Sequence, residues 1–215
     1  MPFGGATASF LAAFDLNRMR YFFFKRVFDL LFSAVVIVGV LSWVLPLLAV
    51  LIRLDTPGSV FFLQKRVGKG GRLFTCIKMR SMIINPQADE LPASWDDKRI
   101  TRVGRWLRRT HLDELPQFVN VFLGSMSLVG PRPYMLADSQ VFSRMAPDYV
   151  VRYHVKPGIT GMAQVKGLHG PLIDRSIINS RLHWDIFYIR HVCFLLDIRI
   201  IRQSILQLFT QQRPV

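Results

Sequence analysis

The feature that most constrains this chain is an uncharged apolar run of 23 residues, from Leu30 to Ile52. As a helix this run would extend ~35 Å, enough to cross a hydrocarbon core of roughly 30 Å. It exceeds the apolar region of a secretory signal, and no small-residue cleavage site follows it. A buried core helix with no polar face would need a much larger protein. The run therefore predicts insertion into a membrane.

Whether this helix spans the membrane is a separate question. Pro46 lies inside the run one turn after Ser42, and a proline there clashes with the Ser42 carbonyl and bends the helix. Basic residues flank both ends, which places both flanks on the cytoplasmic side; they are Arg18, Arg20, Lys25 and Arg26, then Arg53, Lys65, Arg66 and Lys69. A re-entrant helix that bends at Ser42 and Pro46 reconciles these observations. A plain span with a tolerated proline is the alternative that these residues leave open.

The remaining pattern indicates one membrane-associated α+β domain, mostly helical, with amphipathic interfacial helices and a small β-hairpin. We expect three parts: an interfacial approach at 1–24, the membrane helix at 25–54, and a cytosolic-face domain at 55–215. Its expected elements are strands 59–67 and 72–79, a loop at 85–98, helices 101–110 and 114–123, and a final amphipathic helix 195–208 with Leu195, Ile198, Ile201, Ile205 and Leu208 on one face.

The chain carries 28 Lys and Arg against 14 Asp and Glu, a net charge of +14, which implies an anionic partner. Along the expected helix 101–110, four arginines follow helical spacing, which is typical of a helix lying on anionic lipid; they are Arg102, Arg105, Arg108 and Arg109. A solvated charged face is the alternative. We expect no nucleic-acid partner, because no helix-turn-helix, zinc-finger or RNA-binding signature accompanies the charge.

Two adjacent carboxylates, Asp113 and Glu114, follow directly after these arginines. Such a pair could hold a divalent cation such as Mg²⁺, which takes one or two carboxylates together with phosphate oxygens. An aspartate can also attack phosphorus as a nucleophile. The alternative is that Asp113, three residues before Pro116, simply caps a helix in a box with Thr110.

A second candidate group lies downstream, where Pro131 and Pro133 fix the backbone on both sides of Arg132. A guanidinium presented in this way is suited to bidentate phosphate binding. The glycines of 156–164, which end at Gln164, permit close backbone approach to a ligand. An ordinary turn with a surface arginine explains the first segment equally well, and a plain turn explains the second.

Taken together, these segments resemble the bacterial sugar transferases, which are monotopic polyprenyl-phosphate phosphoglycosyl transferases. The matching stretches occur in order and at family spacing from about Lys25 to about Leu208; they are 25–29, 58–68, 78–82, 112–117, 120–121, 126–133, 156–161, 185–188 and 196–197. Several motifs at this density are specific to the family.

The resemblance implies transfer of a sugar-1-phosphate from a nucleotide diphosphate sugar, usually a UDP sugar, to polyprenyl (undecaprenyl) phosphate. It implies a catalytic domain at 55–215 on the cytoplasmic face of the bacterial inner membrane, starting a surface glycan, and it favours the re-entrant helix. Asp113 would be the nucleophile of a covalent phosphosugar intermediate, with Mg²⁺ held by Asp113 and Glu114. Phosphate or substrate contacts would come from Arg132, Lys78, Arg80, Gln164 and Asp185.

The sequence departs from the family pattern at two places. Ser42 and Pro46 are separated by three residues where the family has them adjacent, and Met162, Lys166 and Leu168 replace the family's Trp, Asn and Arg. The second change alters a loop expected to face the sugar or nucleotide, so the sequence does not indicate which sugar is transferred. A different class of function, a membrane-anchored basic protein that binds anionic lipid or polyphosphate without catalysis, does not explain why acids lie inside the basic stretch.

Overall fold

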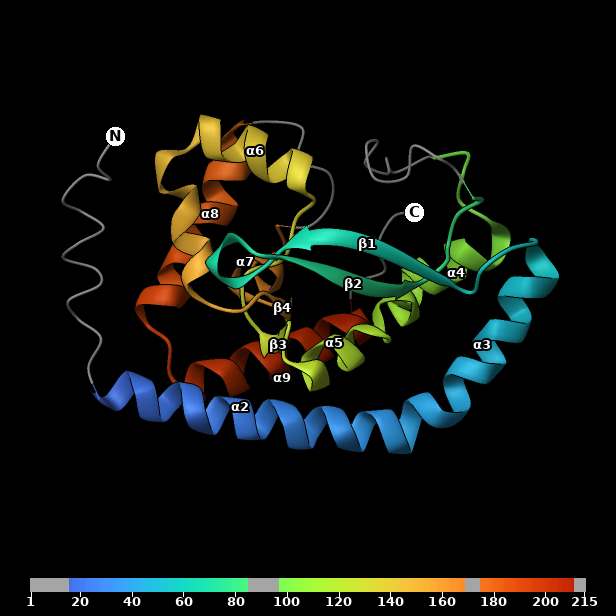
Figure 1. The fold of residues 1–215 in the computed structure, drawn as a ribbon, viewed down its shortest axis with the longest axis horizontal. Coiled ribbons are helices and arrows are strands. Elements are labelled where there is room, and N and C mark those ends of the chain that lie inside the picture. The colour runs from blue at the N-terminus through green and yellow to red at the C-terminus, as the bar shows by residue number, and fades with distance from the viewer. Residues whose placement is uncertain (1–15, 85–96, 169–174, 211–215) are drawn as a thin grey trace.

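A computed structural model describes residues 16–84, 97–168 and 175–210; the loop expected at 85–98 and the approach expected at 1–24 therefore lie largely outside the described residues. The chain begins with α2 (Leu16–Val36), a π-helical turn (Ile37–Leu41) and α3 (Ser42–Asp55). Figure 1 shows this continuous helical stretch running along one edge of the molecule and changing direction between α2 and α3.

The change of direction lies close to the position that the proline predicts. Pro46 is inside α3, and the wider π turn ends one residue before Ser42. The Ser42 hydroxyl donates to the carbonyl of Val38 at 2.6 Å, and the Trp43 indole donates to that of Gly39 at 2.8 Å. Side-chain bonds of this kind to the preceding turn, together with the π geometry, are established causes of helix bending.

After α3 come strands β1 (Phe61–Val67) and β2 (Leu73–Met79), paired antiparallel from Phe61 opposite Met79 to Val67 opposite Leu73. The predicted hairpin is confirmed. Its turn uses Gly70 and Gly71 at φ of 67° and 73°, a conformation that favours glycine. Hydrophobic contacts fix the hairpin against the bent helix: Leu48 and Ile52 of α3 pack with Met79 of β2 and with Leu107 of the next helix.

The central segment holds α4 (Arg102–Thr110), a 3₁₀ turn (Leu112–Glu114) and α5 (Gln117–Leu123). The helix expected at 114–123 therefore begins three residues later than predicted. His111 ends α4 with a φ of 59°, the left-handed conformation, and a separate 3₁₀ turn follows before α5 starts. Thr101 caps α4 by accepting a hydrogen bond from Gly104 N at 2.9 Å.

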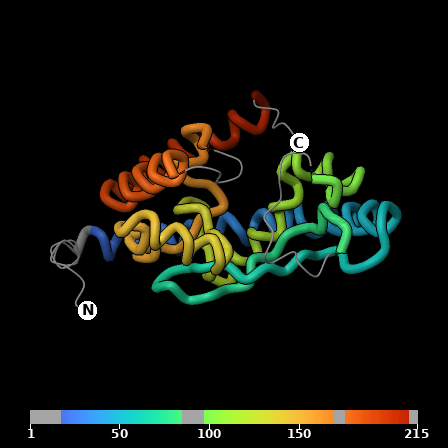
Figure 2. The backbone as a smooth tube through the Cα atoms, turned by 90° about the horizontal axis from the view of Figure 1, so that it is seen from above, coloured from blue at the N-terminus to red at the C-terminus, as the bar shows by residue number. Residues whose placement is uncertain are grey.

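The rest of the chain forms helices around a short parallel pair, β3 (Ser127–Val129) and β4 (Gly158–Thr160). The helical elements are α6 (Leu136–Met145), a 3₁₀ segment (Pro147–His154), α7 (Met162–Val165), α8 (Arg175–Arg190) and α9 (Phe194–Thr210). The predicted final helix is confirmed in α9, but its apolar positions Leu195, Ile198, Ile205 and Leu208 are exposed. Seen from above, the hairpin lies on one side of the molecule and α8 with α9 on the opposite side (Figure 2).

Buried polar contacts tie α2 to this fold. Lys25 forms an ion pair with Asp197 of α9 at 2.7 Å, and Asp29 accepts a hydrogen bond from Leu128 N of β3 at 3.1 Å. Arg26 donates to the carbonyls of Val121 and Phe122 at the end of α5, where a cation is favoured. One face of α2 is therefore bonded to the domain and buried, and its other face exposes apolar side chains such as Phe23, Leu31 and Val35.

Candidate active site

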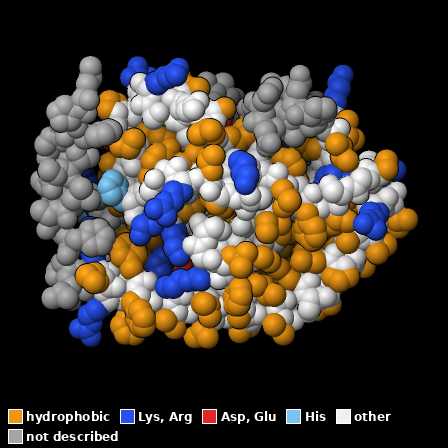
Figure 3. Space-filling model, viewed as in Figure 1, with side chains coloured by type: hydrophobic (Ala, Val, Ile, Leu, Met, Phe, Trp, Pro, Cys, Tyr) orange, Lys and Arg blue, Asp and Glu red, His pale blue; other side chains and the backbone are white. Residues whose placement is uncertain are grey.

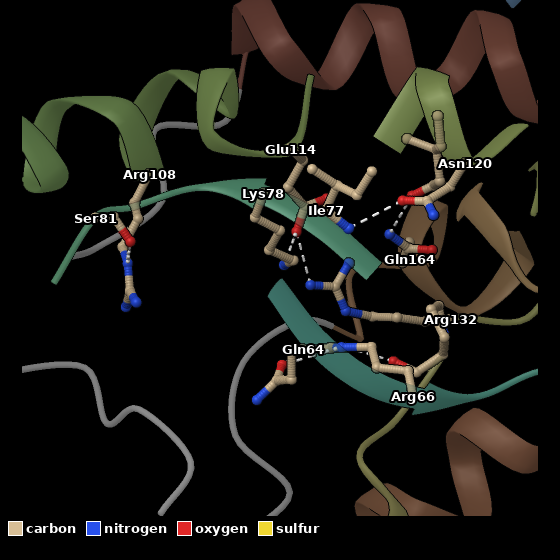
Figure 4. A network of polar contacts seen from close by, with 12 residues as sticks. Gln64, Arg66, Ile77, Lys78, Ser81, Arg108, Glu114, Asn120, Arg132 and Gln164 are labelled. Carbon is tan, nitrogen blue, oxygen red and sulfur yellow. Dashed lines mark hydrogen bonds and ion pairs between the residues drawn. The ribbon is translucent and has the colours of Figure 1, made fainter. Parts of the chain in front are cut away.

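The side-chain amide of Asn120 helps to hold the 3₁₀ turn with Asp113 and Glu114 beside β2. Asn120 of α5 accepts a hydrogen bond from Ile77 N at 2.9 Å and donates to the Thr75 carbonyl at 2.7 Å. These bonds satisfy the outer edge of β2 and fix α5 against it (Figure 4). Because the 3₁₀ turn directly precedes α5, Asn120 places both carboxylates next to the strand that carries Lys78.

Three of the predicted site residues converge in this place. The Oε1 atom of Glu114 accepts from Lys78 Nζ at 3.0 Å and from Arg132 Nη2 at 2.8 Å (Figure 4). The Glu114 carboxylate is 11% exposed, so these are shielded ion pairs and not surface contacts. The Glu114 charge raises the pKa of the Arg132 guanidinium. The sequence-distant Lys78, Glu114 and Arg132 thus form one cluster that keeps two cations beside the acidic pair.

Asp113 has a different environment from its neighbour. Among the described residues, the Asp113 carboxylate has no hydrogen-bond or ion-pair partner, and no side-chain cap is present on the 3₁₀ turn or on α5. The helix-cap interpretation is therefore wrong. Burial and the adjacent Glu114 charge raise the pKa of Asp113 to about 6, against the opposing effect of Lys78, Arg108 and Arg132. A half-buried carboxylate without a partner, surrounded by cations, is available for a ligand or for chemistry.

A buried hydrogen-bond network holds the backbone of Arg132 in place. Arg152 donates through Nε to Asp185 at 2.7 Å, through Nη1 to the Tyr149 hydroxyl at 2.8 Å, and through Nη2 to the Arg132 carbonyl at 2.6 Å. Asp185 is 3% exposed, and its carboxylate forms an ion pair with Arg152. The structure therefore does not bring Asp185 to the acidic pair; Asp185 orients Arg152, which fixes the backbone that presents Arg132.

Two other predicted site residues also face elsewhere. Arg80 is buried and donates to the carbonyls of Thr56 and Pro57 at 2.7 and 2.6 Å, where it stabilises the turn between α3 and β1. Gln164 is buried in α7 and donates to the Ile159 carbonyl at 3.2 Å; within the described residues its Oε1 has no partner. Gln164 is therefore buried in the fold with an unsatisfied acceptor atom, and the terminal guanidinium nitrogens of Arg80 are used within the fold.

Sequence reasoning missed one arginine of this site. Arg108 was grouped with the lipid-facing arginines of α4, yet its Nε donates to Ser81 Oγ at 2.9 Å, and its charge lowers the pKa of Asp113. Arg102, Arg105 and Arg109 are exposed together with Trp106. Leu107 is buried, and the neighbouring Arg108 is partly buried with it, whereas the other three arginines are exposed. The signal in the sequence that could have indicated this difference is the hydrophobic Leu107 directly before Arg108.

The acidic pair can be tested as a magnesium site from its donor atoms. No group of three or more His, Cys, Asp or Glu side chains in the described ranges forms a ready-made metal site. Asp113 offers an unpartnered carboxylate directly beside the carboxylate of Glu114, and one or two carboxylates are the protein ligands that Mg²⁺ uses when substrate phosphates complete its coordination. Since Lys78, Arg108 and Arg132 outnumber the two acids, the residues fit a magnesium ion that arrives with phosphate.

Comparison with known proteins identifies the family of this chain. The bacterial sugar transferase family matches residues 20–211. A UDP-N-acetylgalactosamine-undecaprenyl-phosphate N-acetylgalactosaminephosphotransferase of Aeromonas hydrophila is 42% identical over 88% of this chain and 44% of its own length. A UDP-glucose:undecaprenyl-phosphate glucose-1-phosphate transferase of Caulobacter vibrioides is 40% identical over 86% of this chain and 70% of its own length.

A third relative is close to this chain in length. The "Exopolysaccharide production protein PSS" of Rhizobium leguminosarum is 39% identical over 87% of this chain and 96% of its own length. The chain thus spans less than half of the Aeromonas relative and nearly all of the Rhizobium one. Because the family match covers most of the chain, including the long apolar helical stretch, the hairpin, the acidic pair and the Arg132 segment, the chain belongs to the bacterial sugar transferase family.

Proposed function

We propose that this protein is a phosphoglycosyl transferase that moves a sugar-1-phosphate from a UDP sugar to undecaprenyl phosphate and so starts a surface glycan. The observation that carries the proposal is the unpartnered carboxylate of Asp113 beside Glu114, which is itself ion-paired to Lys78 and Arg132. The printed names of the relatives supply the substrate classes, a UDP sugar and undecaprenyl phosphate. The membrane-anchored binding protein without catalysis gives no role to such a carboxylate.

In the first proposed step, an oxygen of the Asp113 carboxylate attacks the β-phosphorus of the UDP sugar. The bond between that phosphorus and the oxygen bridging it to the α-phosphate breaks, and UMP leaves with the bonding electrons. An aspartyl phosphosugar remains on Asp113. Lys78 and Arg132 lie where they can bind oxygens of the transferred phosphate as charge shifts toward the leaving group.

In the second step, a phosphate oxygen of undecaprenyl phosphate attacks the same phosphorus. The bond between phosphorus and Asp113 breaks, which regenerates the carboxylate and yields the undecaprenyl-diphosphate sugar. Glu114 keeps Lys78 and Arg132 in place through both steps. Mg²⁺ bound by Asp113, Glu114 and substrate phosphates would neutralise phosphate charge.

We further propose that α2 and α3 form a re-entrant, monotopic anchor in the cytoplasmic face of the bacterial inner membrane. The stretch 18–55 is apolar and long enough to enter a bilayer, and it bends between α2 and α3. Apolar side chains gather on the face that α3 and the hairpin form (Figure 3), and those of α9 are exposed as well. The exposed Arg102, Arg105 and Arg109 of α4 would contact anionic lipid headgroups.

The topology can be tested by cysteine labelling in intact cells. Cys193 is exposed and Cys76 buried, so the labelling background is Cys193→Ser. In that background we expect Arg20→Cys and Ser59→Cys, both at exposed positions, to react only with a membrane-permeant maleimide, because a re-entrant helix leaves both ends in the cytoplasm. Reaction of the Arg20→Cys protein with an impermeant reagent added outside, while the Ser59→Cys protein is protected, would show a true span.

The activity can be tested with a panel of UDP sugars, since the relatives named above use different sugars. We expect purified protein in detergent to release UMP from at least one donor when undecaprenyl phosphate and Mg²⁺ are present, and release to stop when EDTA is added. The product is checked as an undecaprenyl-diphosphate sugar by mass spectrometry. A folded protein that binds undecaprenyl phosphate but releases no UMP from any donor would support the non-catalytic alternative.

A further inference from the structure

Arg108 is a cation of the active site to which the mechanism above gives no task. Its Nε is held by Ser81 Oγ at 2.9 Å, and within the described residues its two terminal nitrogens make no hydrogen bond. Burial lowers the pKa of its guanidinium, so the charge sits in a place that disfavours it and no carboxylate is bonded to it. An arginine that is oriented through one nitrogen, with its planar fork left open, is arranged to bind an oxyanion.

Arg108 also lies apart from the other cations of the site. Lys78 and Arg132 both converge on Glu114, whereas Arg108 reaches in from α4 beside Ser81 (Figure 4). Nevertheless Arg108 lies in the last turn of α4, and backbone bonds from His111 N to the Arg108 carbonyl at 3.4 Å and from Glu114 N to the His111 carbonyl at 3.1 Å join this turn directly to the acidic pair. The carboxylate of Asp113 therefore has two separate cationic positions near it, one shared with Glu114 and one formed by Arg108 alone.

We propose that Arg108, oriented by Ser81, binds the phosphate that is exchanged at this site: the α-phosphate that leaves as UMP, and then the phosphate of the incoming polyprenyl phosphate. This rests on the proposed function. In phosphoryl transfer the attacking and leaving oxygens are roughly in line on opposite sides of the phosphorus. Asp113 attacks in the first step and leaves in the second, so it lies on the same side both times. The leaving UMP and the entering polyprenyl phosphate therefore occupy the other side in turn. The transferred phosphate stays with Asp113, Lys78 and Arg132, and the exchanged phosphate takes the open fork of Arg108.

A bilayer headgroup is the other source of phosphate that an arginine of α4 could meet. Arg102, Arg105 and Arg109 of the same helix are exposed, but Arg108 is partly buried and donates to Ser81 of the segment after β2. A headgroup site would behave alike for Arg108 and Arg105, while a site for the exchanged phosphate distinguishes them.

The test is UMP binding by calorimetry in detergent that contains no anionic lipid. We expect Arg108→Ala to raise the Kd for UMP about ten- to a hundredfold, the effect of removing a charge-assisted contact. Arg108→Lys and Ser81→Ala are expected to weaken binding less, because each keeps the charge but loses the fixed orientation. Arg144→Ala, an exposed arginine at the end of α6, is the control, and Arg105→Ala is the comparison for a headgroup site; neither is expected to change the Kd.

A water-soluble short-chain polyprenyl phosphate should displace UMP competitively from the wild-type protein and tenfold or more less effectively from the Arg108→Ala protein. Unchanged UMP affinity in Arg108→Ala, equal losses in Arg108→Ala and Arg105→Ala, or simultaneous binding of both phosphates would overturn the inference. Trapping of a phosphosugar on Asp113 with UDP sugar alone is measured in parallel. Absence of this adduct with an Arg108-dependent Kd contradicts the covalent mechanism and the shared position of the two phosphates, and leaves only a site for the phosphate of UMP at Arg108.

Discussion

The Asp113→Asn substitution is expected to reduce UMP release on the order of a thousandfold or more, as loss of a nucleophile does. The amide cannot attack phosphorus, although it has nearly the same shape and leaves the ion pairs of Glu114 with Lys78 and Arg132 intact. The measurement is UMP release from the UDP sugar that the panel identifies, with undecaprenyl phosphate and Mg²⁺. Turnover close to wild type would contradict the assignment of Asp113 as nucleophile.

The pH dependence of the wild-type protein provides an independent check. The pKa of Asp113 is raised to about 6, so protonation removes the nucleophilic carboxylate as pH falls through this value, and the rate should drop there. A raised carboxylate pKa also means that ionised Asp113 disfavours the folded state above pH 6. Asp113→Asn should therefore not lower the unfolding temperature at neutral pH, which separates lost chemistry from lost folding. A rate that stays constant well below this pKa would argue against an ionised Asp113.

The largest expected effect on stability comes from Arg152→Met. Arg152 and Asp185 form an ion pair at 2.7 Å with side chains 5% and 4% exposed. Removal of one partner leaves a buried charge uncompensated, which typically destabilises a protein by about 3–5 kcal/mol. The substitution also frees the Arg132 carbonyl and the Tyr149 hydroxyl. We expect a much lower midpoint in denaturant-induced unfolding and a loss of UMP release, because the Arg132 segment is no longer fixed.

A second variant distinguishes the uncompensated charge from lost packing. The double substitution Arg152→Met with Asp185→Asn removes the charge as well as the pair, and should recover part of the lost stability. It should not recover activity, since nothing then holds the Arg132 carbonyl. The matched control is Arg144→Met on the exposed surface of α6. If Arg152→Met destabilises the protein no more than this control, the network does not support the site in the way described.

Local sequence patterns correctly predicted those elements whose conformation is set by residues close to one another along the chain. Two strand-like segments joined by a glycine-rich turn predicted the hairpin of β1 and β2, and apolar spacing predicted α9. The long uncharged run and Pro46 predicted a bent helix, because backbone hydrogen bonding and proline sterics act within one or two turns. The adjacent acids and the two prolines around Arg132 marked the site for the same local reason.

Which side chains meet across long sequence separations was decided by the tertiary structure alone. Lys78 and Arg80 are two residues apart on the chain, but Lys78 reaches Glu114 whereas Arg80 is bonded to the turn after α3. Asp185, expected at the substrate, lies behind Arg152 because packing of α8 buries it there. No local sequence pattern predicts which distant residue will form an ion pair or hydrogen bond with a given charged side chain.

The sequence by itself thus determined the family pattern, the apolar helix, the hairpin and the residue types needed for phosphate chemistry. The tertiary structure decided that Asp113 caps no helix, because His111 ends α4 in a left-handed conformation and a 3₁₀ turn intervenes before α5. It also decided that Arg108 separates from Arg105 and Arg109, since burial of Leu107 against Met79 rotates one arginine of α4 toward Ser81. Packing rotates the helix as a whole, and this rotation selects which charge faces the substrate.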